Sequence, residues 1–243
     1  MIKGYANIKI KAKDTAAALK IYTDALQMPL VDENTVAFPE GTTVTVIEGD
    51  TVRAEKSGFT HLCLDSCNAD DGWARATDLG AVPSREDDHP TGGGGLYGGF
   101  LRFAGGEEVE LWHICKNDAL SEPYTPGNFV KAFVHTAITA PDKEKAIAFY
   151  EALGIRLKLD WGWGCSMQLA NKQELEIFPG GDRVPNESGI YEVSFAVEDA
   201  KACYDIALAN GGIADGDAII GLAGERIRFV EGVDIKTVDL FGD

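Results

Sequence analysis

The sequence predicts an α+β fold in which one small unit, a strand followed by a helix and further strands, occurs four times. Three observations support this prediction. Four strand-like segments each reach an Asp or Asn that can cap a following helix. Two of the helix ends are nearly identical, and short β-prone stretches follow each helix. The first-strand residues and the caps seven positions later are Asn7 and Asp14, His61 and Asn68, His135 and Asp142, and Glu192 and Asp199.

The first and third units are of one type. Residues 7–14 read Asn-Ile-Lys-Ile-Lys-Ala-Lys-Asp, and residues 135–142 read His-Thr-Ala-Ile-Thr-Ala-Pro-Asp. A tyrosine follows each Asp by eight positions, as Tyr22 and Tyr150, and the helices end in Asp-Ala-Leu-Gln-Met and Glu-Ala-Leu-Gly-Ile. The second and fourth units instead end their helices in Leu-Gly-Ala and Gly-Gly-Ile. This alternation is typical of a two-unit chain that has been duplicated and fused.

Further strands are expected after each helix, at 42–48, 99–103, 107–112, 174–178, 226–230 and 236–241. Gly-rich turns at 91–99 and 178–182 separate them. The four modules are therefore expected at 1–56, 57–128, 129–185 and 186–243. The second ends in a linker, residues 117–128, which contains two prolines and no periodicity.

Composition limits the classes of partner. The chain of 243 residues has a formal net charge of −17, which argues against binding to nucleic acid or to an anionic membrane surface. No apolar run is long enough for a membrane span or a secretory signal. The five cysteines include no Cys-x-x-Cys pair, so reduced thiols are expected, and Cys63 with Cys67 suits no common zinc framework. The sequence therefore predicts a soluble cytoplasmic protein, a monomer or homodimer, with a small-molecule partner.

The repeat resembles the vicinal oxygen chelate superfamily, which includes glyoxalase I, bleomycin-resistance proteins and extradiol dioxygenases. Three segments carry this resemblance: residues 135–155, the stretch His61-Leu-Cys-Leu with Gly58 ahead of it, and Glu108-Val-Glu-Leu-Trp112. The resemblance implies four βαβββ modules that form two half-open, cup-shaped mixed β-barrels with helices outside. It also implies a metal inside a cup, with ligands from the first and last strand of each module.

The expected ligands depend on which modules pair. If neighbours pair, as domains at about 1–120 and 129–243, no good metal site forms. If the second module pairs with the third and the first with the fourth, one cup gathers His61, Glu110, His135 and Glu176. The sequence favours this exchanged arrangement, since two imidazoles and two carboxylates balance the charge of a divalent cation. The other cup would hold a degenerate set, namely Asn7, Thr45, Glu192 and Asp239.

The orientation of the two glutamates stays open at this level. A plain alternating strand would direct Glu110 and Glu176 to solvent, whereas the resemblance implies that they point into the cup. The distance between His61 and His135 decides whether one metal can be shared, because ligand bonds of about 2.1 Å require ring nitrogens within about 4 Å.

The resemblance implies a metal-dependent lyase or isomerase of the glyoxalase I type. It would use Ni, Co or Zn and act on a hemithioacetal or α-hydroxycarbonyl substrate through an enediolate. Glu176 or Glu110 would act as the general base, and Lys131 would contact the substrate, as a basic residue contacts glutathione in that family. Two alternatives are a metal-free binding or resistance protein and an extradiol dioxygenase-like enzyme with Fe(II). Whether the chain is an enzyme at all is therefore left open by the sequence.

Overall fold

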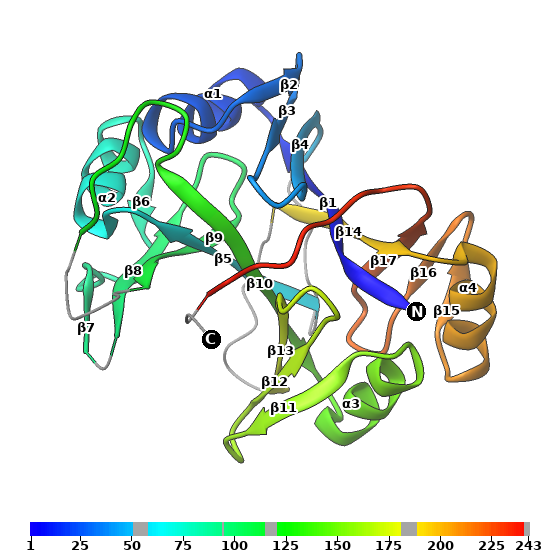
Figure 1. Ribbon diagram of the computed structural model, residues 1–243. Helices are drawn as coiled ribbons and strands as arrows, with labels where there is room; N and C mark the ends of the chain where they lie inside the picture. The colour runs from blue at the N-terminus through cyan, green and yellow to red at the C-terminus, as the bar shows by residue number, and fades with distance from the viewer. Residues whose placement is uncertain (51–57, 94, 115–120, 181–188, 241–243) are drawn as a thin grey trace.

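The computed structural model describes residues 1–50, 58–93, 95–114, 121–180 and 189–240, and within them the fold is of the predicted α+β class. Two open mixed sheets lie back to back, and the helices lie on the convex sides of the sheets, away from the concave sides that form the cups (Figure 1). Neither sheet closes on itself, which agrees with the expected half-open cups. Among the described residues, no helix has the length and apolar character needed to cross a bilayer.

The strands and helices follow the four-fold repeat, and each module begins with a long strand and a helix. The first contains β1 (Ile2–Ala12), α1 (Thr15–Lys20), the π-helical turn η1 (Ile21–Ala25), β2 (Leu30–Asp32), β3 (Thr35–Ala37) and β4 (Thr43–Glu48). The second contains β5 (Gly58–Ser66), α2 (Ala69–Asp78), β6 (Val82–Pro83), β7 (Thr91–Gly93), β8 (Leu96–Arg102) and β9 (Glu108–Ile114). The third contains β10 (Val130–Ala140), α3 (Lys143–Ala152), β11 (Arg156–Asp160), β12 (Cys165–Gln168) and β13 (Glu174–Pro179). The fourth contains β14 (Ile190–Val197), α4 (Ala200–Ala209), β15 (Ile213–Asp215), β16 (Ala218–Ile220) and β17 (Arg226–Val230).

The helix starts are confirmed at all four repeats. Each predicted cap has extended backbone, and its side-chain oxygen accepts a hydrogen bond from the backbone N–H three residues later. This bond satisfies one of the donors that the first helical turn leaves without a partner. The four caps are Asp14, Asn68, Asp142 and Asp199.

The strands of the first module pair with those of the fourth, and the strands of the second module pair with those of the third. One sheet has the order β15-β16-β17-β14-β1-β4-β3-β2 and so joins the fourth module to the first. The other has the order β11-β12-β13-β10-β5-β9-β8-β6 and joins the third module to the second. Antiparallel pairs form both junctions, β1 with β14 and β5 with β10. Of the two arrangements open from the sequence, the strand order is therefore the exchanged one.

Two sequence-based expectations about strands are wrong. Residues 236–240 form no strand, and the fourth module ends its sheet with β17, which pairs in parallel with β14. The expected Gly-rich turn at 91–99 instead contains β7 and the start of β8, which pair with each other. The expected module boundaries at 56 and 185 lie outside the described residues. Residues 121–128 of the predicted linker contain one isolated bridge, from Ser121 to Asn68.

Two buried tyrosine–glutamate hydrogen bonds connect sequence neighbours across the two sheets. The Tyr22 hydroxyl donates to Glu107 Oε1 over 2.8 Å, and the Tyr150 hydroxyl donates to Glu225 Oε1 over 2.5 Å. The first bond joins the first module to the second, and the other joins the third to the fourth. Strand pairing thus joins the first module to the fourth and the second to the third. The buried side-chain contacts join the first to the second and the third to the fourth.

Burial governs the protonation of both glutamates in these pairs. Removal from water penalises the carboxylate and raises the pKa of Glu107 and of Glu225 to about 7, although the tyrosine and backbone donors lower it in part. Below the pKa of the unfolded chain, a buried acid with a raised pKa is protonated in both the folded and the unfolded state, so it does not lower the free energy of unfolding. Folding stability is then lost as the pH rises from there through the folded-state pKa.

The Glu225→Gln variant should therefore unfold with a weaker dependence on pH. Because the ordinary pKa of this carboxyl is 4.5 and its folded value is about 7, the effect lies between those two pH values. Between pH 5 and pH 8 the parent should lose about 2–3 kcal/mol of stability relative to the variant, in addition to a pH-independent offset from the amide nitrogen, which cannot accept the bond that Ala223 N–H donates. Urea unfolding at both pH values measures this. The exposed Glu151→Gln on α3 is the control, and a Glu225→Gln slope that matches the control contradicts the assignment.

Candidate metal centre

Four strands at the centre of the β11–β6 sheet position the predicted ligands. In the parallel pair β5–β9, Cys63 lies opposite Glu110, and in the parallel pair β10–β13, Ala137 lies opposite Glu176. His61 itself lies opposite Glu108, and His135 lies opposite Glu174. Each glutamate of the cluster is therefore two residues beyond the partner of its module's histidine. Because side chains two residues apart on a strand share a face, His61 and Glu110 point the same way, as do His135 and Glu176. The antiparallel β5–β10 pair then brings the two modules together.

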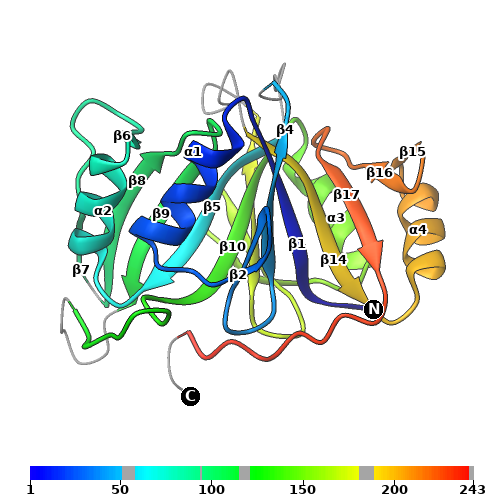
Figure 2. The same ribbon diagram turned by 90° about the horizontal axis from the view of Figure 1, so that it is seen from above.

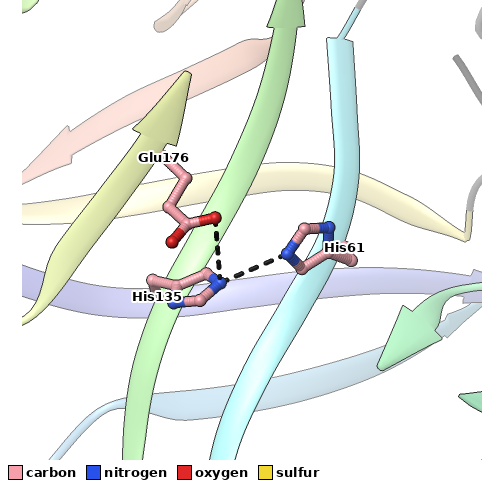
Figure 3. A group of neighbouring side chains, drawn as sticks. All are labelled: His61, His135 and Glu176. Atoms are coloured by element: carbon pink, nitrogen blue, oxygen red, sulfur yellow. Dashed lines mark hydrogen bonds and ion pairs between the residues drawn. The ribbon is translucent and has the colours of Figure 1, made fainter. Parts of the chain in front are cut away.

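The four predicted ligands converge on the concave side of this sheet. His61 Nε2 lies 3.2 Å from His135 Nε2 (Figure 3). Glu110 Oε2 is 3.5 Å from the His61 nitrogen and 3.3 Å from the His135 nitrogen. Glu176 Oε2 is 3.7 Å from His135 Nε2. The His61–His135 distance is below the limit of about 4 Å that a shared ion requires.

The cluster is buried and its charges interact strongly. Burial alone would lower the pKa of His135, but the Glu176 and Glu110 carboxylates outweigh it and raise the pKa to about 9. Burial would raise the pKa of Glu110, but His135 and His61 hold it well below its usual range. Neither glutamate points to solvent, since the Glu110 side chain is 10% exposed and that of Glu176 is 17% exposed.

These donors fit a divalent transition metal. Bonds of about 2.1 Å place neighbouring ligand atoms roughly 3 Å apart and opposite ones roughly 4.2 Å apart, and the four separations given above lie in that interval. Two imidazole nitrogens and two carboxylate oxygens suit Zn, Ni, Co or Fe(II). His61, His135 and Glu176 form one set whose donor atoms all lie within 4.8 Å of one another. Cys63, Glu110 and His135 form a second such set.

A cavity of about 300 Å³ opens above the cluster. Glu110, His135 and Glu176 line it on the metal side, and its other walls are mainly apolar. Inside it Lys158 forms an ion pair with Glu174, and the Ser166 hydroxyl donates to the same carboxylate. The apolar wall residues are Leu96, Trp112, Ile114, Val134, Leu159 and Trp161.

Sequence reasoning missed several residues of this cavity. Cys63 lies two residues after His61 on the same strand face, and burial raises the pKa of its thiol well above the usual value. Glu174 lies two residues before Glu176 and lines the same wall. Both could have been found from strand alternation once His61 and Glu176 were placed inside the cup. Lys158 and Ser166 carried no comparable signal.

Lys131, the predicted substrate contact, does not line the cavity at the metal cluster. Its ammonium group lies 3.2 Å from Asp65 Oδ2 and 3.2 Å from Glu122 Oε1. It lines a separate cavity of about 340 Å³ together with Asp239. The structure therefore brings together His61, Glu110, His135 and Glu176 and leaves Lys131 apart from them.

The second cup has a different composition from the one expected. Arg228, opposite Ser194 in β14, occupies the position that corresponds to Glu110 and Glu176, so the assignment of Asp239 to this cup is wrong. The buried Glu192 forms ion pairs with Lys9, Arg226 and Arg228 at 2.8, 2.9 and 3.1 Å. These cations outweigh burial and lower the pKa of Glu192.

The remaining two predicted positions of the second cup bind each other. The Asn7 amide donates to Thr45 Oγ1 over 2.8 Å. Three cations beside one carboxylate would repel a metal ion, so this cup offers no candidate metal site among its described residues.

Comparison with solved structures identifies the fold. Glyoxalase I from Zea mays matches with a TM-score of 0.69 and 17% identity, over 95% of this chain and 93% of that one. Its V278E mutant matches with a TM-score of 0.71. A candidate dioxygenase from Bacillus subtilis subsp. subtilis str. 168 matches with a TM-score of 0.66 and 12% identity, over 95% and 85% of the two chains. The chain thus has the fold of the vicinal oxygen chelate superfamily. No family model and no curated protein matches its sequence.

Replacing His135 by Ala should weaken binding of a divalent metal by at least about 100-fold, because it removes one imidazole from the shared set. Calorimetric titration with Zn²⁺ or Co²⁺, together with elemental analysis, measures the loss. Asn7→Ala changes the equivalent residue of the second cup and should leave metal content unchanged. A His135→Ala protein that folds and binds metal as tightly as the parent would show that the ligand assignment is wrong.

Proposed function

We propose that the chain is a metal-dependent lyase or isomerase that moves a proton at a carbon beside two substrate oxygens, as glyoxalase I-type enzymes do. One observation carries the proposal: two buried imidazoles and two carboxylates meet on the wall of a cavity large enough for a small molecule. A divalent cation held by His61, Glu110, His135 and Glu176 would supply Lewis-acid stabilisation of negative charge on the substrate oxygens.

The two glutamates have different environments, which supports different roles. Glu110 Oε2 lies within 3.5 Å of both imidazoles, so this carboxylate is held in the centre of the cluster. Glu176 Oε2 lies 3.7 Å from His135 Nε2, and the Glu176 side chain is 17% exposed against 10% for Glu110. A general base must reach both the cluster and the substrate carbon. Glu176 is therefore assigned as the base and Glu110 as a fixed ligand.

The walls of the cavity support proton transfer away from bulk water. Trp112 and Trp161 line it, and Trp161 stacks on Trp163, which stacks in turn on Phe178. An apolar wall lowers the local dielectric, so the charges of the cluster act more strongly on a bound substrate. The fold shared with the glyoxalase I structures of Zea mays is consistent with this reaction class, although a fold alone does not define an activity.

Glu176→Gln should lower turnover by roughly 10²–10⁴-fold, since that is the usual contribution of a general base. Metal content should fall far less than in Glu110→Gln, which removes the carboxylate shared by both histidines. Turnover of hemithioacetals made from an aromatic 2-oxoaldehyde and neutral or charged thiols, by protein loaded with Zn, Ni or Co, measures the effect. Equal turnover in Glu176→Gln and parent contradicts the assignment. A parent protein that binds no metal would favour the non-catalytic alternative.

A second function, Fe(II)-dependent dioxygenation, has one specific observation in its favour. His61, His135 and Glu176 form a two-histidine, one-carboxylate set, the ligand type of many Fe(II) oxygenases (Figure 3). Glu110 weighs against it, since a fourth protein donor leaves fewer positions for oxygen and substrate. Oxygen uptake by the Fe(II)-loaded protein with catechol distinguishes the two functions, because the proton-transfer reaction consumes no oxygen.

A further inference from the structure

The segment that follows β17 closes one end of the cup that contains the candidate metal centre. From the β15–β2 sheet the chain runs along the lower edge of both sheets and reaches the other sheet (Figure 2). Residues 236–240, here called the strap, are held there by the backbone: Lys236 N–H donates to Glu40 O and Val238 N–H donates to Asn171 O, each over 2.8 Å. This segment of the fourth module is thus held by backbone bonds to the first and third modules.

The strap presents two apolar side chains to the cup. Val238 and Leu240 are each 5% exposed. They belong to a hydrophobic cluster with Cys63, Ile114 and Val134, three residues that line the cavity above the metal cluster. The strap therefore adds apolar packing behind the cavity wall and limits how far a ligand can extend toward this end of the sheet.

Beyond the strap lies the second cavity, which is strongly acidic. Lys131 is held between Asp65 and Glu122, and Lys236 lies 3.4 Å from the backbone oxygen of Pro39. Four carboxyl groups therefore face two ammonium groups there: Glu40, Asp65, Glu122 and Asp239 against Lys131 and Lys236. A ligand carboxylate entering this cavity would meet net negative charge.

The cavity at the metal cluster is equally unsuited to a ligand carboxylate. Among the described residues that line it, Lys158 is the single lysine or arginine, and it forms an ion pair with the buried Glu174. Glu174 also accepts a hydrogen bond from Ser166, so the lysine is held by a fixed partner. A formal charge of −17 on the whole chain adds a long-range field that disfavours anions.

We propose that the substrate of this site is a small, uncharged molecule with a largely apolar body and two chelating oxygens, and that glutathione conjugates are excluded. The two chelating oxygens of the substrate are inferred from the proposed function, and its uncharged, apolar body is inferred from the two cavities. A glutathione conjugate carries two carboxylates, and the lysines of both cavities are already held by protein acceptors. An aryl or alkyl group instead suits the walls formed by Trp112, Trp161 and Leu96.

The test uses two probes that share one chelating group. The first is an N-phenylhydroxamic acid, which is neutral before it binds, and the second is the same group carried on the sulfur of glutathione. Both are titrated calorimetrically against the full chain loaded with Zn²⁺ or Co²⁺. The neutral probe should bind at least about tenfold more tightly. Equal or tighter binding of the glutathione-linked probe overturns the inference, as does failure of both to bind the metal-loaded protein.

Variants that remove an acidic partner of Lys131 test whether charge excludes the glutathione-linked probe. Asp65→Asn removes one acidic partner of Lys131 while its amide oxygen can still accept the hydrogen bond from Ile114 N–H. Binding of the glutathione-linked probe should then increase several-fold, and binding of the neutral probe should not change. Glu122→Gln removes the other partner at a more exposed position and serves if Asp65→Asn fails to fold. No gain for the charged probe in either folded variant contradicts the charge argument.

A failure of the proposed function can be distinguished from a failure of the inference about the substrate. If the chain takes up no metal, the proposed function falls, and the same probes are titrated against the metal-free chain. Tryptophan fluorescence reports binding there, because Trp112 and Trp161 line the cavity. Tighter binding of the neutral probe supports the inference about the ligand body. Preference for the glutathione-linked probe, or no binding of either, overturns it.

Discussion

The antiparallel pairing of β5 with β10 is the contact on which the candidate site depends. It joins strands from the second and third modules and brings His61 Nε2 to 3.2 Å from His135 Nε2. The other ligands follow from it, since Glu110 and Glu176 lie on the strands that pair in parallel with β5 and β10. Had the first module paired with the second and the third with the fourth, the two histidines would lie in different sheets and could share no ion.

The exchange of partners also explains the buried acids between the sheets. The first and second modules follow each other in the chain, as do the third and fourth, yet in both cases their strands belong to different sheets, so their contact comes from side chains. The hydrogen bonds from Tyr22 to Glu107 and from Tyr150 to Glu225 supply it at equivalent places. Each costs the desolvation of a carboxyl group, which the tyrosine donor offsets only in part. The two halves are thereby interlocked rather than arranged as consecutive independent domains.

The two cups show how one scaffold supports opposite electrostatics. At equivalent positions, one cup has His61, His135 and two glutamates, whereas the other has Asn7, Glu192 and arginine. An ion-pair network fills the latter, so a cation there would meet like charges. The strap adds a further asymmetry, because it packs against the cup with the histidines. The residues at equivalent positions of the two cups thus differ in charge, and among the described residues the candidate metal centre lies in the cup with the histidines.

The sequence by itself determined what is local and repeated: four modules, their N-caps at Asp14, Asn68, Asp142 and Asp199, and the placement of His and Glu on first and last strands. Only the tertiary structure decided the inward direction of Glu110 and Glu176, because a strand covered on both faces loses its alternating pattern. It also decided that residues 236–240 form a strap, and that Cys63 and Glu174 join the cavity. These outcomes depend on contacts between distant segments, such as His61 with His135, which leave no local signal in the chain.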